Sequence, residues 1–245
     1  MTTATLYDAM FSGVIGQDYE MLKLLAPLAV EMSRLVGATV SQHPKTDDKP
    51  LNVVELGGGT GITTLSILAA TDAIQLLSVD NEPVMQGQAQ KKLQAWQAQG
   101  KLAFCLDDAL SALQQLADGS VDVVASAYTL HNFPNGYRQQ VISEIFRVLK
   151  PAGQFVNGDR YALDDIDQHT RTTQTEVGRY FRLLTAANKL DLLEHWMVHL
   201  FSDESENHIM RESLALQQLA AVGFAGIHLS NRSEVNALVT AYKPR

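Results

Sequence analysis

The sequence predicts an α/β protein with a doubly wound, mostly parallel sheet. Two observations lead to this prediction. First, short apolar runs alternate with amphipathic stretches from Leu51 to Asn157, a pattern typical of right-handed crossovers with helices on both faces of a parallel sheet. Second, Gly57, Gly59 and Gly61 follow the first apolar run at every second position, as in a tight turn between a strand and a helix. The 245 residues, 46% of them hydrophobic, suffice for a full core.

The first fifty residues predict helices and a loop. Between positions 18 and 36, apolar residues recur at helical spacing. They are Tyr19, Leu22, Leu25, Leu28, Met32 and Leu35. Pro27 should divide this stretch into two helical pieces, because proline removes a backbone donor. Residues 37–50 are polar and contain two prolines, which indicates a loop. We therefore expect residues 1–50 to form an N-terminal helical cap.

The central region alternates strands and helices. Strands are expected at 51–56, 74–79, 102–106, 121–127 and 154–157. Helices are expected at 62–70, 83–99, 109–116 and 136–149. Pro83 suits the first position of a helix, and Gly100 suits the position just after its end. We expect residues 51–163 to form the ligand-binding core.

The pattern changes after the fifth strand. Residues 164–201 and 204–222 predict helices, and we expect the whole of 164–222 to be a helical lid inserted into the core. Two short strands, 226–230 and 235–242, are joined by a short turn and therefore predict an antiparallel hairpin. This hairpin, within residues 223–245, should complete a sheet of seven strands.

Composition excludes several classes of protein. The net charge of −8 argues against broad nucleic-acid binding. The only cysteine, Cys105, excludes a disulfide framework, and its apolar surroundings favour a buried position. The N-terminus lacks the basic start of a signal peptide, and no stretch approaches the roughly 20 apolar residues of a membrane span. We therefore expect a cytoplasmic protein that does not enter a membrane.

The glycine turn predicts a ligand without a pyrophosphate. The dinucleotide fingerprint places a third glycine where this chain has Ile62, and no Lys-Ser/Thr follows as in a P-loop. Glu55 precedes the turn, where a carboxylate repels phosphate but can bind an amino group. Asp80 ends the second strand and could accept both hydroxyls of a ribose. Asp108 follows the third strand and could accept from an adenine amino group. Together these residues describe an adenosine with an amino-acid end.

In this respect the chain resembles the class I (Rossmann-like) S-adenosylmethionine-dependent methyltransferases. Five motifs, in order, carry the resemblance. They are Glu55-Leu56-Gly57-Gly58-Gly59-Thr60-Gly61, Val79-Asp80-Asn81-Glu82-Pro83-Val84-Met85, Asp108-Ala109, Asp122-Val123-Val124-Ala125-Ser126-Ala127-Tyr128-Thr129-Leu130-His131 and Leu149-Lys150-Pro151-Ala152-Gly153. The resemblance is close over residues 51–161 and looser towards the C-terminus, where the hairpin would supply the family's antiparallel last strand.

The resemblance implies S-adenosylmethionine as cofactor, S-adenosylhomocysteine as product, and a set of contacts to them. Gly57 and Gly59 would lie against the methionine part, with Glu55 near its amino group. The ribose would be held by Asp80. The remaining implied contacts are Asn81 and Ala109 flanking the adenine, Asp108 near its amino group, the Ser126 backbone under the sulfonium, and Tyr19 from the N-terminal segment.

The acceptor side is less well determined by the sequence. Methyl transfer from a sulfonium mainly requires alignment of donor and acceptor, and a general base is optional. His131 follows the fourth strand, at the sheet edge where ligands bind, and is the candidate base. The candidate substrate contacts are Tyr128, Asn132, Arg160, Tyr161 and Trp196. Arg160 could bind an acidic substrate or pair with Asp164 or Asp165.

Histidines on the predicted lid raise the question of a metal. His195 and His199 are one helical turn apart and His208 is nearby, a spacing that could hold a metal ion. The chain contains no HExxH motif, and methyl transfer does not require a metal. Solvated or packed histidines are therefore the preferred interpretation, and no metal site is expected.

The sequence favours a small-molecule methyltransferase acting on oxygen or nitrogen, as a monomer or homodimer. Residues 180–224 also resemble carboxy-S-adenosylmethionine synthases, although Leu190 stands where an arginine would be expected to bind the extra carboxylate. Two other classes remain as alternatives. One is a non-catalytic S-adenosylmethionine-binding regulatory protein, and the other is an NAD-dependent oxidoreductase, which Ile62 disfavours.

Overall fold

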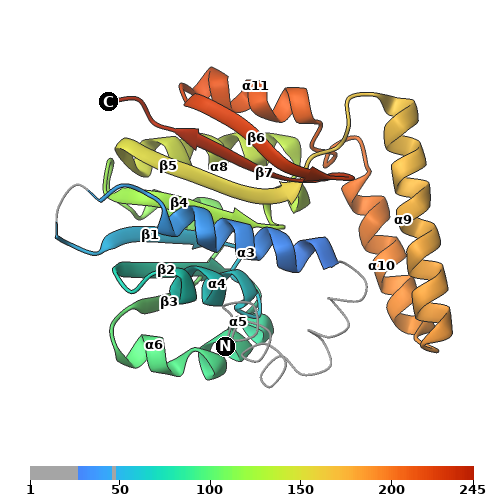
Figure 1. Cartoon of the computed structure of the whole chain (residues 1–245), viewed down its shortest axis with the longest axis horizontal. Helices are drawn as coiled ribbons and strands as arrows, with labels where there is room; N and C mark the ends of the chain where they lie inside the picture. The colour runs from blue at the N-terminus through green and yellow to red at the C-terminus, as the bar shows by residue number, and fades with distance from the viewer. Residues whose placement is uncertain (1–26, 46–47) are drawn as a thin grey trace.

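A seven-stranded sheet forms the centre of the molecule, with helices on both of its faces (Figure 1). The computed structural model describes residues 27–45 and 48–245. The expected helical piece before Pro27, including Tyr19, lies outside the described residues. Within the part of the chain that the structure describes, no helix is both long and apolar enough to cross a membrane.

The sheet has the strand order β3-β2-β1-β4-β5-β7-β6. Its strands are β1 (Leu51–Leu56), β2 (Ile74–Asp80), β3 (Leu102–Leu106), β4 (Val121–Ala127), β5 (Leu149–Arg160), β6 (Ala225–Ser233) and β7 (Asn236–Tyr242). Strands β1 to β5 pair in parallel, whereas β7 runs antiparallel to both β5 and β6. The predicted sheet, with its reversed last strand, is confirmed.

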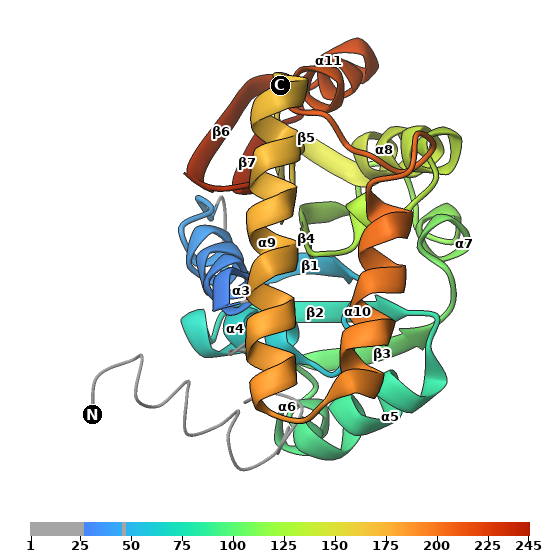
Figure 2. The same ribbon diagram turned by 90° about the vertical axis from the view of Figure 1, so that its right-hand side faces the viewer.

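Two layers of helices bury the two faces of the sheet. The helices are α3 (Pro27–Ser41), α4 (Ile62–Ala70), α5 (Pro83–Lys92), α6 (Gln94–Ala98), α7 (Ala109–Gln114), α8 (Asn135–Val148), α9 (Ile166–Ala186), α10 (Leu190–Asp203) and α11 (Glu212–Val222), with a short 3₁₀ turn, η1 (Leu130–Asn132). One buried apolar cluster joins α7, α8 and α11 to the sheet, and a second joins α3 and α4 to the opposite face. Figure 2 shows these two layers on either side of the strands.

Helices α9 and α10 form an antiparallel pair of their own. They stand across the carboxyl ends of the parallel strands (Figure 2). A separate small core holds the pair together, built on Tyr180, Leu184, Leu193 and Leu200. Strand β1 lies between β2 and β4, and the strand order reverses beside it. The chain runs from β1 through β2 to β3 on one side, and then continues with β4 on the other side. Ligands bind at such a point in open α/β sheets, and α9 and α10 cover it.

Three predicted boundaries are wrong. Helix α3 continues through Gly37 to Ser41 because Gly37 packs against α4 and does not end the helix; an added Cβ would lie 2.5 Å from the Ser66 carbonyl oxygen. The single helix expected at 83–99 is broken at Leu93, whose side chain is buried in the core. Strand β5 begins five residues earlier than expected, since Leu149 already pairs with Val121.

The segment 204–211 was expected to be helical, and this prediction is also wrong. It turns back to the core, where Arg211 forms an isolated β-bridge with Ala162. The backbone N–H of Ala162 donates to the Met210 carbonyl oxygen at 2.8 Å. Helix α11 therefore begins only at Glu212. The α9–α10 pair is thus joined to the core at both of its ends.

Candidate active site

The glycine turn lies at the carboxyl end of β1 and is bonded to its neighbour β2. The N–H groups of Gly57 and Gly58 both donate to the Val79 carbonyl oxygen, at 2.8 and 3.1 Å. Gly57 has a φ of +74°, and a Cβ there would lie 1.9 Å from Thr129 Oγ1. The turn therefore requires glycine for both backbone conformation and close approach.

Two cavities meet at this turn. The outer cleft, of about 890 Å³, runs over the ends of β2 and β3. The inner cavity, of about 290 Å³, lies between the turn and the α9–α10 pair. Five residues line both spaces. They are Gly57, Gly59, Met85, Tyr128 and Asn132. A ligand in the outer cleft can therefore present one end to the inner cavity.

Asp80 lies in the wall of the outer cleft and organises the turn. Its Oδ2 accepts from the Gly59 N–H at 2.7 Å, and its Oδ1 accepts from the Glu82 N–H at 2.8 Å. Each carboxylate oxygen can accept a second hydrogen bond. Asn81 and Ala109 line the same cleft. These three predicted residues are brought together.

Asp108 also lines the cleft, but its carboxylate is already well bonded. It caps α7, accepting from the N–H of Ser111 at 3.0 Å and from its hydroxyl at 2.6 Å. The Tyr137 hydroxyl donates to Oδ1 at 2.7 Å. These hydrogen bonds, those from Ser111 foremost, lower the pKa of Asp108 to about 2. Asp108 therefore stays ionised and holds α7 against α8.

Glu55 and Ser126 lie beneath the turn, outside the residues that line the two cavities. Glu55 is fully buried, and Thr64 Oγ1 donates to its Oε2 at 2.6 Å. Burial raises the pKa of Glu55 to about 7, against the opposing effect of its hydrogen bonds. The Ser126 hydroxyl is buried in the sheet and donates to the Leu56 carbonyl oxygen at 3.2 Å. The sequence placed both residues at the correct strand ends but could not show which way their side chains point.

His131 lies in the wall of the inner cavity, on η1. Only 5% of the residue is exposed, and its Nδ1 lies 2.5 Å from Asp159 Oδ1. Asp159 is fully buried and also accepts from the backbone N–H groups of Leu130 and Arg160. Burial opposes ionisation of Asp159, but His131 and these hydrogen bonds outweigh it and lower its pKa. Nδ1 is thereby oriented towards Asp159, and Nε2 is the ring nitrogen left for other partners.

Tyr128 and Asn132 form the boundary between the two cavities. Tyr128 has a φ of +50°, and its hydroxyl donates to Asn236 Oδ1. The Asn132 side-chain amide donates to the Tyr128 carbonyl oxygen at 3.1 Å. Both predicted residues therefore contact the space where a donor and an acceptor would meet.

Arg160 lines the inner cavity but is paired with acids that the sequence did not suggest. Its guanidinium donates to both oxygens of Glu176, at 2.8 and 3.1 Å, and to Glu204 Oε1 at 3.3 Å. The sequence suggested two kinds of partner for Arg160, an acidic substrate or the nearby Asp164 and Asp165. The partners found in the structure, Glu176 and Glu204, are neither of these. Glu176 and Glu204 come from distant parts of the chain, so sequence spacing carries no indication of them.

Tyr161 does not line either cavity. Its ring lies in the core beneath α8 and α11, and its hydroxyl accepts from Asn157 Nδ2 at 2.8 Å. Successive residues of an extended chain point to opposite sides, so Arg160 faces the cavity and Tyr161 faces the core.

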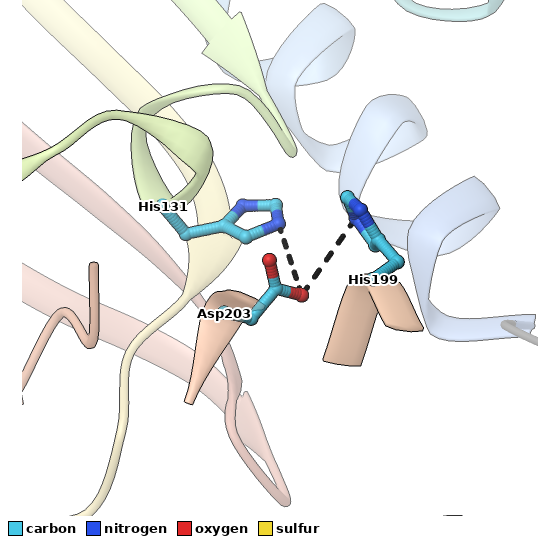
Figure 3. Close-up of side chains that lie close together, drawn as sticks. All are labelled: His131, His199 and Asp203. Carbon is cyan, nitrogen blue, oxygen red and sulfur yellow. Dashed lines mark ion pairs between the residues drawn. The ribbon is translucent and has the colours of Figure 1, made fainter. Parts of the chain in front are cut away.

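Helix α10 contributes four residues to the inner cavity, and they are Trp196, His199, Leu200 and Asp203. Trp196 was predicted, and its ring lies edge-on to His199 with centroids 5.9 Å apart. His199 and Asp203 follow at one-turn intervals and approach His131 (Figure 3). Asp203 was missed, although an acid four residues after His199 must share its helix face. His208 lies elsewhere, with Nδ1 2.9 Å from the Ser205 hydroxyl.

Comparison with known proteins agrees with this geometry. A family model described as "Methyltransferase domain" matches residues 53–153. A solved O-methyltransferase family protein from Burkholderia thailandensis has a TM-score of 0.60 at 18% identity, covering 88% of this chain and 57% of that chain. The solved CurJ carbon methyltransferase has a TM-score of 0.62 at 17% identity, covering 99% of this chain and 67% of that one. Residues 53–153 thus match a methyltransferase domain, and the chain has the fold of solved Rossmann-like methyltransferases.

Curated proteins similar to this chain include carboxy-S-adenosyl-L-methionine synthases and demethylmenaquinone methyltransferases. The carboxy-S-adenosyl-L-methionine synthase of Erwinia tasmaniensis is 23% identical over 228 residues, which is 90% of this chain and 89% of that protein. The demethylmenaquinone methyltransferase of Leptospira interrogans is 35% identical over 109 residues, which is only 44% of this chain and 43% of that protein. These comparisons support an enzyme, and the regulatory-protein and NAD-dependent alternatives are not retained.

The cofactor is S-adenosylmethionine, with S-adenosylhomocysteine as product. The residues present fit that molecule. Gly57 and Gly59 line both spaces, and without side chains of their own they leave their backbone open to a ligand. Asp80 keeps acceptor capacity in the outer cleft, and the cleft opens into the inner cavity at the turn.

Proposed function

We propose that the enzyme transfers a methyl group from S-adenosylmethionine to an oxygen or nitrogen of a small molecule bound in the inner cavity. The observation that supports this proposal most directly is the junction of the two cavities at Gly57, Gly59 and Tyr128. The inner cavity, of about 290 Å³, suits a small acceptor better than a macromolecule.

In this proposal the outer cleft holds the cofactor. Gly57 and Gly59 would lie against its methionine part, and Asp80 would accept from the ribose hydroxyls. Asn81 and Ala109 would flank the adenine. Asp108 would act mainly through the position of α7, because its oxygens are already bonded to Ser111 and Tyr137. Once bound, the cofactor supplies a methyl group on a positively charged sulfur.

His131 would act on the acceptor. Nδ1 donates to Asp159, so Nε2 carries the lone pair and can accept the proton that an O–H or N–H acceptor loses. The acceptor atom gains the methyl carbon, and the electron pair of the broken S–C bond stays on sulfur. Tyr128, Asn132 and Trp196 would orient the acceptor and exclude water.

A reaction like that of the carboxy-S-adenosylmethionine synthases is the second candidate, since the Erwinia relative matches nearly its whole length. That chemistry requires a cation for the additional carboxylate. Leu190 occupies the position where the arginine is expected, and the two arginines lining the inner cavity are engaged by Glu176, Glu204 and Glu234. Methyl transfer is therefore the first candidate.

Calorimetric titration with S-adenosylmethionine, S-adenosylhomocysteine and NAD tests the cofactor site. We expect saturable heat with the first two at one shared site. Asp80→Ala should weaken both affinities about 100-fold or more, because two hydrogen bonds to a charged acceptor are worth roughly 1.5–3 kcal/mol each. Asp72→Ala, at an exposed carboxylate far from the cleft, is the matched control. Heat with NAD alone, or equal affinities in both variants, would contradict the proposal.

Turnover tests the role of His131. Purified enzyme is screened against phenols, alcohols and amines, and methylated products are identified by mass spectrometry. With an accepted compound, His131→Gln should lower kcat about 10²–10⁴-fold while S-adenosylmethionine affinity stays within a few-fold. His228→Gln, on exposed β6, serves as control. A cofactor released from the purified protein as the carboxylated form would favour the second candidate.

A further inference from the structure

We propose that this enzyme binds one divalent transition-metal ion, of the zinc type, between His131, His199 and Asp203 in the wall of the inner cavity. The imidazole and carboxylate ligand atoms of these three residues all lie within 4.8 Å of one another. Figure 3 shows the two rings and the carboxylate converging from η1 and α10. The proposal goes beyond the proposed function, because methyl transfer as such requires no metal.

Two of the three separations are close to those of a metal site, and the third, between His131 and His199, is within 4.8 Å. Asp203 Oδ2 lies 3.8 Å from His131 Nε2 and 3.7 Å from His199 Nε2. In a tetrahedral site with bonds of about 2.0–2.1 Å, ligand atoms are about 3.3 Å apart. The three side chains thus need to close by only a few tenths of an ångström at these two edges. His199 can make this movement, since 42% of its side chain is exposed.

The two fixed ligands are held in place by the fold. His131 and Asp203 are both nearly buried, with 6% and 7% of their side chains exposed. Asp159 fixes the ring of His131 from behind, at 2.5 Å from Nδ1. A histidine that binds a metal usually donates the N–H of its second ring nitrogen to a carboxylate in this way. This hydrogen bond sets the tautomer and makes the metal-binding nitrogen more basic. The outer contact that a metal-binding His131 needs is therefore already present.

The charge around the three ligands also favours a cation. Glu176, Asp203 and Glu204 all lie within 4 Å of the Arg160 guanidinium, and Asp159 lies against His131. Three carboxylates thus share one guanidinium, with His169 Nε2 at 2.6 Å from Glu204, while Arg179 is paired with Glu234. A divalent cation at His131 would reduce this excess of negative charge.

The ligand types select the kind of metal. Two imidazoles and one carboxylate are the set found in open zinc sites, with the fourth position left for water or substrate. Mg²⁺ prefers oxygen ligands and near-octahedral geometry, so it should bind far more weakly. The fourth position here faces the inner cavity, which Trp196 and Tyr128 also line. A bound cation would therefore be placed to ligate an acceptor hydroxyl or amine, and His131 would then be a ligand and not the base.

The sequence did not suggest this set of residues. The spacing of His195 and His199 indicated a pair on one helix, and no metal was expected. The structure instead brings His199 and Asp203 of α10 to His131, which follows β4. Residues so far apart in the chain can be paired only once the position of α10 over the sheet is known.

Direct metal binding by the full chain tests the proposal. The protein is treated with a chelator, dialysed, and titrated with Zn²⁺ alone by calorimetry and with Co²⁺ by visible absorption. We expect one site per chain, an intense Co²⁺ band of tetrahedral type, and at least 100-fold weaker binding of Mg²⁺. His199→Gln and Asp203→Asn should each weaken Zn²⁺ binding about 100-fold or more, and Asp159→Asn about 10–100-fold. His228→Gln, an exposed histidine outside the cluster, should leave it unchanged.

The outcomes are distinct from those that test methyl transfer. Absence of a saturable Zn²⁺ site would overturn the proposal, and so would Zn²⁺ binding that neither His199→Gln nor Asp203→Asn reduces. Circular dichroism confirms that each variant is folded. His199 is more exposed than Asp203, so His199→Gln is the variant less expected to disturb folding. S-adenosylmethionine titration of the metal-free protein proceeds independently, so failure of the metal site leaves the proposed function standing.

Discussion

Glu55 illustrates at the scale of one residue how a predicted contact can acquire a different role. The acid precedes the glycine turn, yet its carboxyl group is buried behind Gly58 among Thr64 and Ser78. Its Oε1 has no hydrogen-bond partner among the described residues. A buried carboxyl group with one oxygen unpaired is more stable protonated, so burial raises its pKa to about 7.

This raised pKa makes Glu55 a source of pH-dependent instability. Between the unfolded value of 4.5 and about 7, the folded chain holds a proton that the unfolded chain has lost, so stability falls as pH rises. Above about pH 7 the loss in the free energy of unfolding is complete, and for such a pKa shift it amounts to roughly 2–4 kcal/mol. Glu55→Gln should therefore be more stable than the parent by that amount at pH 8, and equally stable at pH 4.

Urea unfolding curves of both proteins, recorded between pH 4 and pH 8, measure this difference. Glu206→Gln changes an exposed carboxylate in the same way and should show little difference at either pH. An advantage of Glu55→Gln that is the same at every pH would show that proton uptake is not its cause.

At the scale of elements, the contact between α3 and α4 depends on a glycine. Gly37 lies within α3, where an added Cβ would be 2.5 Å from the Ser66 carbonyl oxygen. Gly87 lies within α5, and a Cβ there would meet nothing within 4 Å. The two positions share a helical backbone but differ in the space around them.

Alanine at these two glycines should therefore have opposite effects. Gly37→Ala should destabilise the protein by about 1–3 kcal/mol, because the two helices must move apart. Gly87→Ala should stabilise it by about 0.4–1 kcal/mol, since alanine restricts the unfolded chain at no cost in packing. Thermal and urea unfolding measure both. Equal effects in the two variants would contradict the close packing of α3 on α4.

The same contrast explains how much the sequence could predict. The first four strands were placed to within one residue because buried parallel strands are continuous apolar runs between turn residues, and this information is local. Gly37 was misinterpreted as a helix end because a glycine permits both a turn and a close approach, and only the neighbouring helix decides between them. In the site, Asp80 and Ala109 follow from strand ends, whereas the partners of Arg160 depend on where α9 and α10 lie.

At the scale of the whole molecule, the outer cleft, proposed to hold the methyl donor, and the inner cavity, proposed to hold the acceptor, are built from different parts of the chain. The outer cleft is built from the turns that follow β1, β2 and β3, which carry the family's motifs. The inner cavity owes its far wall to α9 and α10, including Glu176, Trp196 and Asp203. The parts of the chain that could be interpreted from sequence are those proposed to hold the cofactor, and the part that could not is the one proposed to surround the acceptor.

The bridge between Ala162 and Arg211 has a consequence for how such an enzyme can evolve. The chain leaves the core at Ala162 and returns beside it, where the Glu212 N–H donates to the Ala162 carbonyl oxygen at 2.9 Å. The intervening residues 163–210 are therefore a module whose two ends are neighbours. A lineage can lengthen, shorten or exchange such a module without disturbing the strands on either side. New acceptors are accessible by that route while the methyl donor stays the same.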